Sequence, residues 1–169
     1  ERQRYAEVLR AKLGISWQPA EPVTPSTIAA AAGIGYDVLL QKAQADPQLA
    51  VAIIGAQEKT LAAMSHKALA DKTRQFRQQL QDGHSLESIT LEALAVFREM
   101  ARRRIHERAA PEQVLSAVYL AQPRAMAVEQ PSGQGKTLSI ALAAYVWALK
   151  GEGVHVHTFN EYLAGRDGA

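Results

Sequence analysis

Residues Ser132–Thr137 read Ser-Gly-Gln-Gly-Lys-Thr and lie between a short apolar run, Ala125–Val128, and an alanine- and leucine-rich stretch, Leu138–Leu149. Glycines in such a turn can adopt dihedral angles that point successive main-chain N–H groups to one side, where they form a concave site for an anion. A helix that begins directly after the turn adds the positive end of its dipole. The segment therefore predicts a phosphate-binding loop between a strand and a helix.

Each residue of this loop has an expected role. Gly133, Gln134 and Gly135 form the main-chain nest, and Lys136 is expected to reach the β- and γ-phosphates of a nucleotide. The Thr137 hydroxyl is the expected ligand of the Mg²⁺ ion bound with the nucleotide. The strict eight-residue pattern begins with glycine, whereas this chain has Gln130 at that position. A chance Gly-Gln-Gly turn is therefore the alternative interpretation.

The remainder of the chain is predicted to be mostly helical. Apolar residues recur at helical spacing, and capping residues mark the starts, among them Thr24 followed by Pro25, and Ser65. Gly33 and Gly35 are expected to kink the second helix or to let it pack very closely. The predicted helices span residues 1–12, 25–45, 47–64, 65–83, 90–105, 111–120 and 138–149, with a linker over Ile15–Val23 and a turn at Gln122–Arg124.

Strand signals are confined to the last part of the chain. The run Ala125–Val128 precedes the loop, and Val154–Thr158 follows two glycines that end the helix after the loop. Together with that helix the two runs predict a βαβ unit, so the predicted fold class is α/β with a helical N-terminal leader. Parallel sheets normally contain more strands, and no Asp-Glu pair follows an apolar strand here. We therefore expect an N-terminal portion of a larger nucleotide hydrolase that does not turn over ATP by itself.

Composition narrows the class of protein further. The 169 residues include no cysteine, which excludes disulfides and thiolate metal sites, and the net charge of +2 indicates no particular partner. No run reaches the roughly 18 apolar residues of a membrane span. His155 and His157 alternate with valines and are expected to be packed or hydrogen-bonded rather than to bind metal, so no metal ligand is assigned to them.

Two further groups of side chains have expected environments. Trp147 and Tyr162 are expected in the core. An arginine cluster near the end of the 90–105 helix is expected to be a solvated helix end that complements the helix dipole, with an anionic lipid or nucleic-acid patch as the alternative. The members of this cluster are Arg98, Arg102, Arg103 and Arg104.

From about Met64 onward, several ordered blocks resemble the N-terminal part of the SecA preprotein translocase ATPases. Gly133–Leu138 is similar to the family's Gly-Glu-Gly-Lys-Thr-Leu, and Gly153–Thr158 to its Gly-Val-His-Val-Val-Thr. Asn160–Asp167 is similar to Asn-Asp-Tyr-Leu-Ala-x-Arg-Asp. Earlier blocks, Lys72–Arg77 and Glu92–Glu99, follow the family's Lys-Thr-x-x-Phe-Arg and Glu-Ala-Phe-Ala-Val-x-Arg-Glu.

The resemblance implies a DEAD-type motor with a RecA-like nucleotide-binding domain that uses ATP and Mg²⁺. Such a motor couples ATP hydrolysis to the export of unfolded preproteins through a SecYEG-type channel, and it is cytoplasmic and peripheral at the inner face of the membrane. No nucleic-acid partner is implied. By resemblance, Gln113 is the glutamine that recognises adenine. The implied divisions are a helical extension over residues 1–63, a helical lead-in over 64–110, and the start of the nucleotide-binding domain over 111–169.

The chain departs from the family pattern at several positions. Ala110 replaces an aromatic residue, Pro131 a basic residue and Gln134 a glutamate, and two extra residues lie around Gln122–Ala125. These departures favour an alternative in which a divergent helical module docks a partner and its nucleotide site is degenerate. A small-molecule P-loop kinase would explain the loop alone but not Asn160–Asp167.

Overall fold

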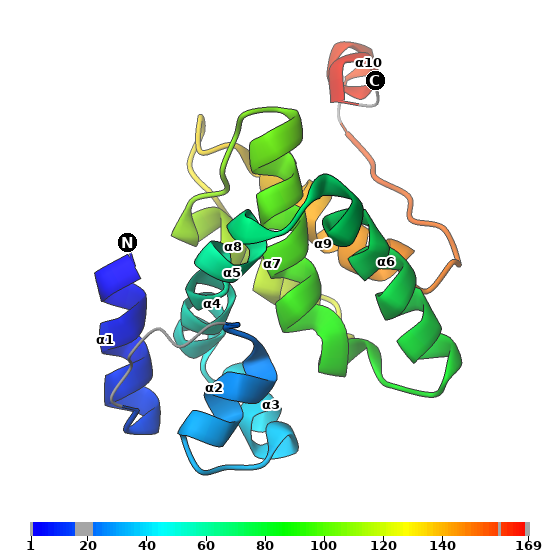
Figure 1. Cartoon of the computed structure of the whole chain (residues 1–169). Coiled ribbons are helices and arrows are strands. Elements are labelled where there is room, and N and C mark those ends of the chain that lie inside the picture. Colours follow the sequence, from blue (N-terminus) through cyan, green and yellow to red (C-terminus); the bar gives the residue numbers. More distant parts are fainter. Residues whose placement is uncertain (1, 16–21, 159, 168–169) are drawn as a thin grey trace.

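The structure is a computed structural model that describes residues 2–15, 22–158 and 160–167, and helices make up most of this part of the chain (Figure 1). They are α1 (Arg2–Leu13), α2 (Pro25–Ala31), α3 (Tyr36–Ala45), α4 (Pro47–Ala56), α5 (Glu58–Ala63), α6 (His66–Gln81), α7 (Leu86–Arg104), α8 (Pro111–Leu120), α9 (Lys136–Ala148) and α10 (Glu161–Asp167). Most of the predicted linker Ile15–Val23 lies outside the described residues.

Local capping chemistry sets most helix starts. Thr24 accepts a hydrogen bond from the Thr27 main chain, with Pro25 at the first helical position, and Ser65 accepts one from Ala68. Asp46 caps α4 in the same way. These starts confirm the predicted ones. Gly14 follows α1 with φ of +69°, the left-handed conformation that favours glycine at a helix end.

Three predicted helix boundaries were wrong. The predicted 25–45 helix is two helices, because Gly33 has φ of +66° and the chain re-enters helix only after Gly35, the N-cap of α3. The predicted 47–64 helix is interrupted at Gln57. The helix expected from Thr90 begins at Leu86, where Ser85 accepts a hydrogen bond from the Ser88 main chain.

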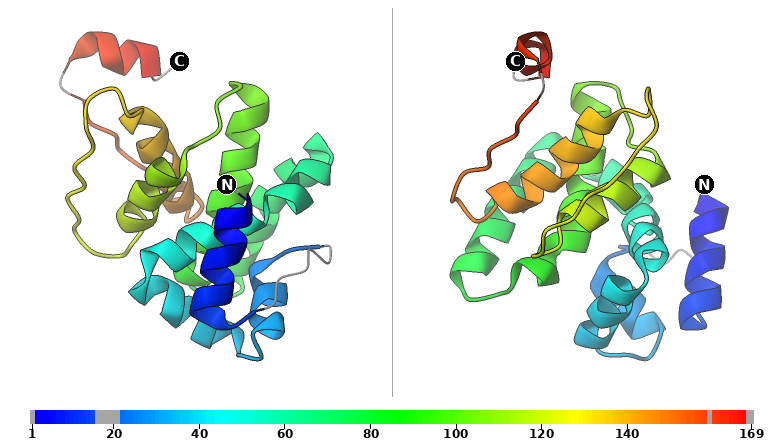
Figure 2. Two further views of the ribbon diagram at one scale, coloured as in Figure 1. Left: turned by 90° about the vertical axis from the view of Figure 1, so that its left-hand side faces the viewer. Right: turned by 180° about the vertical axis from the view of Figure 1, so that it is seen from behind.

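The core is built around α4 and α7. Seven of the ten residues of α4 are buried, and this helix packs against α1, α3, α7 and α8. The longest helix, α7, packs against α4, α5, α6 and α9 and runs through the middle of the molecule (Figures 1 and 2). The helices of residues 1–63 therefore share one core with α7 and α8. The predicted division at Met64 stays a prediction.

The predicted α/β fold class, with its RecA-like βαβ unit, was wrong. Within the described residues there is no strand, and both predicted strands, Ala125–Val128 and Val154–Thr158, are irregular. Parallel strands are stable in sheets of several strands that are covered on both faces, and two short strands do not meet that requirement. Gly151 and Gly153, with φ of +80° and +79°, instead turn the chain onto an exposed path on which Val156 is 58% exposed.

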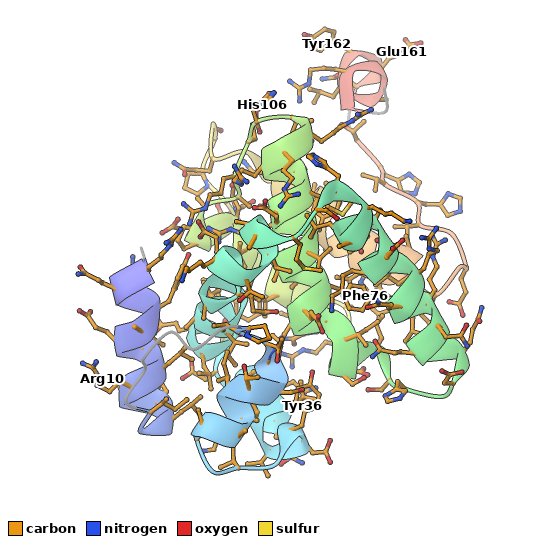
Figure 3. All side chains as sticks on the ribbon, in the orientation of Figure 1. Arg10, Tyr36, Phe76, His106, Glu161 and Tyr162 are labelled. Carbon is orange, nitrogen blue, oxygen red and sulfur yellow. The ribbon has the colours of Figure 1, made fainter. Side chains whose placement is uncertain are left out.

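The segment after α9 extends from the helical body and ends in α10, which projects from the rest in each view (Figures 1 and 2). Tyr162 on α10 is 74% exposed and points outward (Figure 3), so its expected place in the core was wrong. Trp147 is partly buried. His155 and His157 are exposed, so they are not packed in the core.

Candidate functional site: the loop before helix α9

The loop before α9 has the backbone conformation that its glycines permit. Gly133 has φ of +79°, and Gly135 has φ of +67° and is the left-handed N-cap of α9. The Gln134 N–H donates to the Pro131 carbonyl across the turn at 3.4 Å. The loop thus leads straight into a helix whose first N–H groups have no partner within the helix. This arrangement directs main-chain donors and the positive end of a helix dipole to one place.

Lys136 folds back over this loop. Its ammonium group donates to the Pro131 carbonyl oxygen at 3.1 Å, although the side chain belongs to the first residue of α9. Thr137 is the second residue of the helix, and residues 131–137 are all exposed. The ammonium group, the threonine and the turn are therefore on an accessible part of the surface.

Gln113 holds the loop from the neighbouring helix. It is the third residue of α8, and its Oε1 accepts from the Ala110 N–H at 2.8 Å, as a glutamine in a capping box does. Its Nε2 donates to the carbonyls of Gln134 and Gly135, at 2.9 Å and 3.2 Å. The resemblance predicts adenine recognition for Gln113, and in the structure its amide contacts the loop. The spacing of Gln113 after Pro111 was a capping signal from which part of this role could have been predicted.

Helices α6, α7 and α8 fix the position of α9. Leu142 and Val146 are buried on one side of α9, which packs against α7 and α8. Trp147 Nε1 donates to the Leu120 carbonyl of α8 at 3.1 Å. The Tyr145 and Thr73 hydroxyls are 2.8 Å apart, which ties α9 to α6, and burial raises the pKa of Tyr145 above its usual value. The loop is consequently held by Gln113 of α8 and by the fixed position of α9.

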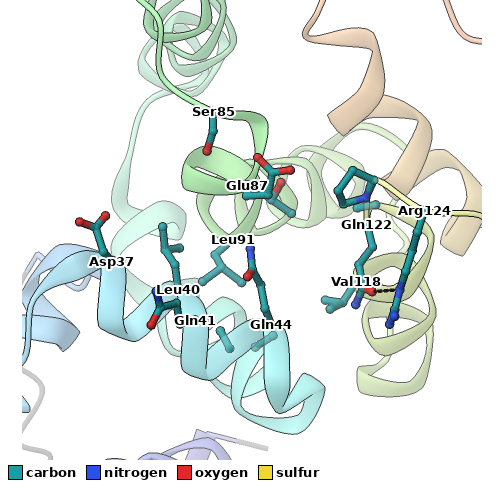
Figure 4. A pocket seen from close by; sticks show the side chains of 15 residues that line it. Asp37, Leu40, Gln41, Gln44, Ser85, Glu87, Leu91, Val118, Gln122 and Arg124 are labelled. Atoms are coloured by element: carbon teal, nitrogen blue, oxygen red, sulfur yellow. Dashed lines mark hydrogen bonds between the residues drawn. The ribbon is translucent and has the colours of Figure 1, made fainter.

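A separate pocket lies away from the loop. It has a volume of ≈ 800 Å³ and is lined by α3, the start of α7 and the end of α8 with the turn after it (Figure 4). Its lining includes the carboxylates of Asp37 and Glu87, and Arg124 donates to Gln122 there at 2.8 Å. No residue of the loop 132–137 lines it. Carboxylates repel phosphate, so we retain the loop as the candidate site for a phosphorylated ligand.

Comparison with known proteins identifies the family. The family model described as "SecA DEAD-like domain" matches residues 39–169. The chain belongs to this family. The match to the SecA DEAD-like domain begins at Leu39, within α3, and takes in the whole loop, α9 and α10.

Individual SecA proteins show the same relationship. The chain is 44% identical over 110 residues to "Protein translocase subunit SecA" of Methylococcus capsulatus, which is 65% of this chain and 12% of that protein. It is 44% identical to the proteins of the same name from Anaplasma marginale, over 68% of the chain and 13% of the relative, and from Rhodopseudomonas palustris, over 69% and 12%. The chain thus spans about an eighth of the length of these SecA relatives.

None of the helices in the described ranges has both the length and the apolar character needed to cross a membrane. Among the same residues, no group of three or more histidine and carboxylate side chains is placed to hold a metal ion.

Proposed function

We propose that this chain is the ATP-binding front portion of a SecA-like protein-translocating ATPase, with the phosphates bound by residues 133–137. The observation that carries the proposal is the left-handed Gly135 at the N-terminus of α9, with the Lys136 ammonium group folded over the same turn. Membership of the SecA DEAD-like domain family supports it. In this proposal the loop binds the phosphates without a β-sheet behind it.

Lys136 has the most direct role in this proposal. Its ammonium group already lies over the turn, 3.1 Å from the Pro131 carbonyl, and a phosphate oxygen is a stronger acceptor for it because that contact joins two full charges. Main-chain N–H groups of Gly133 and Gly135 are the proposed donors to the remaining phosphate oxygens, and the Gln134 N–H joins them once it leaves the Pro131 carbonyl. The Thr137 hydroxyl is the proposed protein ligand for Mg²⁺.

Gln113 can contribute to adenine recognition only in part while it holds the loop. Its two Nε2 hydrogens are directed to the Gln134 and Gly135 carbonyls, and Oε1 accepts from Ala110. An amide oxygen has two lone pairs, so Oε1 can accept a second hydrogen bond. We propose that the adenine amino group donates to Oε1, and that Gln113 keeps its bonds to the loop.

The wider activity is proposed from the family. The relatives are protein translocase subunits, and we propose for the parent protein coupling of ATP hydrolysis to export of unfolded preproteins through a SecYEG-type channel. A cytoplasmic position, peripheral at the inner face of the membrane, belongs to the same proposal.

Titration of a fluorescent ATP analogue, with and without Mg²⁺, tests the nucleotide site. We expect saturable binding that Mg²⁺ strengthens, and we expect Thr137→Ala to remove most of the Mg²⁺ effect. Ser132→Ala is the matched control, since Ser132 is an exposed hydroxyl in the same loop to which no role is assigned. An equal loss of the Mg²⁺ effect in both variants would contradict the role of Thr137.

The second candidate is a helical interaction module with a degenerate nucleotide site. It is favoured by the engagement of both Gln113 donors with loop carbonyls and by Ala110, which offers no ring to stack on a base. The same titration decides between the two functions. The absence of saturable binding at millimolar analogue would support the interaction module and contradict the ATP-binding proposal.

A further inference from the structure

Arg98 is a buried arginine outside the loop. It lies on α7, is 4% exposed and pairs with Glu58 of α5 at 3.5 Å. Its Nε donates to the Ala109 carbonyl at 2.8 Å, in the segment that leads into α8. A buried guanidinium is retained only where its charge and its donors are satisfied, so these contacts fix the side chain in one position.

The Ala109 carbonyl belongs to the same peptide unit as the Ala110 N–H. A peptide unit is planar and rigid, so Arg98 at its oxygen end also fixes the direction of its N–H end. That N–H donates to Gln113 Oε1 at 2.8 Å, and Gln113 Nε2 in turn donates to the carbonyls of Gln134 and Gly135. Hydrogen bonds that are connected through the 109–110 peptide and the Gln113 side-chain amide therefore join Arg98 to the candidate phosphate-binding loop.

The series extends in the other direction to the N-terminal helix. Tyr5 of α1 is 4% exposed, and its hydroxyl lies 3.5 Å from Arg98 Nη2. Its ring lies directly over Gly55 of α4, where any Cβ would collide with ring atoms. Gly55 thus lets α1 approach closely enough for Tyr5 to reach Arg98.

We infer that Arg98 is a positioning residue for the loop, and that through Tyr5 it couples the docking of α1 to nucleotide binding. The inference rests on the proposed ATP-binding function for its consequence, because the loop is the element that Arg98 positions. Displacement of α1 would release the contact between Tyr5 and Arg98 and so loosen the 109–110 peptide. Because Gln113 accepts from that peptide, its bonds to the loop carbonyls would loosen as well. A partner or upstream segment that moves α1 would in this way weaken nucleotide binding.

Arg98→Lys is the direct test, because lysine keeps a positive charge beside Glu58 but lacks the planar fork that reaches the Ala109 carbonyl. Arg103→Lys is the matched control: Arg103 is also on α7, is also paired with a glutamate, and also donates to main-chain carbonyls, at Leu61 and Ala62. The first readout needs no nucleotide. It is the ¹⁵N NMR signal of the Gln113 side-chain amide, assigned by its loss in Gln113→Glu.

We expect the Gln113 amide signal to shift in Arg98→Lys and to stay in place in Arg103→Lys. Affinity for the fluorescent ATP analogue should fall about 2- to 30-fold in Arg98→Lys alone, the range found for residues that couple sites without touching a ligand. An unshifted Gln113 signal in folded Arg98→Lys would overturn the inference. If the unmodified chain binds no analogue while the signal still shifts, the proposed function fails and the structural link stands.

Tyr5→Phe provides a milder variant should Arg98→Lys fail to fold. It removes a single hydroxyl and keeps the ring over Gly55, so we expect a smaller shift of the Gln113 signal in the same direction. Tyr36→Phe is its control, since the Tyr36 hydroxyl donates to the Ser88 carbonyl at 2.6 Å and lies outside the series. Equal effects of the two variants, or no shift in Tyr5→Phe, would contradict coupling to α1.

Discussion

Gly135 is the residue on which the shape of the candidate site most depends. Its φ of +67° is a conformation that residues with a Cβ adopt only at a cost, and the Gln113 Nε2 lies only 2.3 Å from the position that a Cβ would take. Gly133 has a similar φ of +79° but has no atom within 4 Å of the corresponding position. Alanine at position 133 would therefore introduce backbone strain alone. Alanine at position 135 would introduce the same strain and also displace Gln113.

We predict that Gly135→Ala destabilises the chain more than Gly133→Ala does. Both variants should lose about 1–2 kcal/mol of unfolding free energy through the left-handed backbone. Gly135→Ala should lose about 1 kcal/mol more, because the new methyl group displaces the Gln113 amide from the two carbonyls. Urea unfolding measures both values, and equal losses would show that Gln113 does not hold the loop.

Single-residue roles were only partly predictable from the sequence. The requirement for glycine at 133 and 135 follows from local backbone geometry, so the sequence motif predicts it. Arg98 was grouped with a solvated helix end, yet it is buried, because Glu58, Tyr5 and the Ala109 carbonyl come from segments that only the tertiary fold brings to it. Arg102 and Arg103 both bind Glu99, and Arg104 is exposed as expected.

At the scale of elements, the start of α7 offers a clear test. The sequence favoured Thr90, whereas Ser85 is the observed N-cap and Thr90 donates to the Leu86 carbonyl inside the helix. We predict that Ser85→Ala costs about 1 kcal/mol of unfolding free energy and Thr90→Ala less than about 0.5 kcal/mol. Chemical denaturation compares the two variants, and the reverse order would place the helix start at Thr90.

The N-terminus of α4 should make stability depend on pH. Asp46 caps this helix, and its hydrogen bond with Lys12 of α1, across 2.7 Å, holds the pKa of Asp46 below its usual range. Because the folded pKa is lower than the unfolded one, the carboxylate stabilises the fold above the unfolded pKa. That contribution is lost as pH falls through the folded pKa.

Asp46→Asn keeps a good N-cap and removes the titrating group, so it isolates this effect. We predict that the variant is less stable than the unmodified chain at neutral pH, and that the difference shrinks as the pH falls below about 5. Unfolding free energies measured at a series of pH values provide the comparison. A difference that stays constant, or grows, toward acid pH would contradict the pairing with Lys12.

Elements were predictable where their determinants are local. Caps at Thr24, Asp46 and Ser65 lie within three residues of the groups that they bind, so sequence spacing reveals them. Strands, by contrast, depend on partners that are distant in the sequence. Val154–Thr158 has the alternating pattern of a strand, but it pairs with no other strand among the described residues. The break at Gln57 has no glycine or proline at the break itself, although Gly55 lies two residues earlier in α4. Gln57 donates to the Ile53 carbonyl at 3.1 Å and is buried.

At the scale of the whole molecule, a helical body presents the loop with Gly133 and Gly135 where α8 and α9 meet. Helices from the first 63 residues pack in the same core as α8, so the leader and the loop belong to one folded unit. The family match and the loop geometry both support the proposal that the exposed turn before α9 binds the phosphates of ATP. The helical body then acts as the support that holds Gln113 and α9 in place.

Calorimetric titration of ATP and of adenosine into the unmodified chain and into Lys136→Ala tests this account most directly. Only phosphates interact with the Lys136 charge, so we predict that ATP affinity falls about 10- to 100-fold in the variant while adenosine affinity is unchanged. Equal losses for ATP and adenosine, or an ATP affinity that the substitution leaves unaltered, would contradict phosphate binding at this loop.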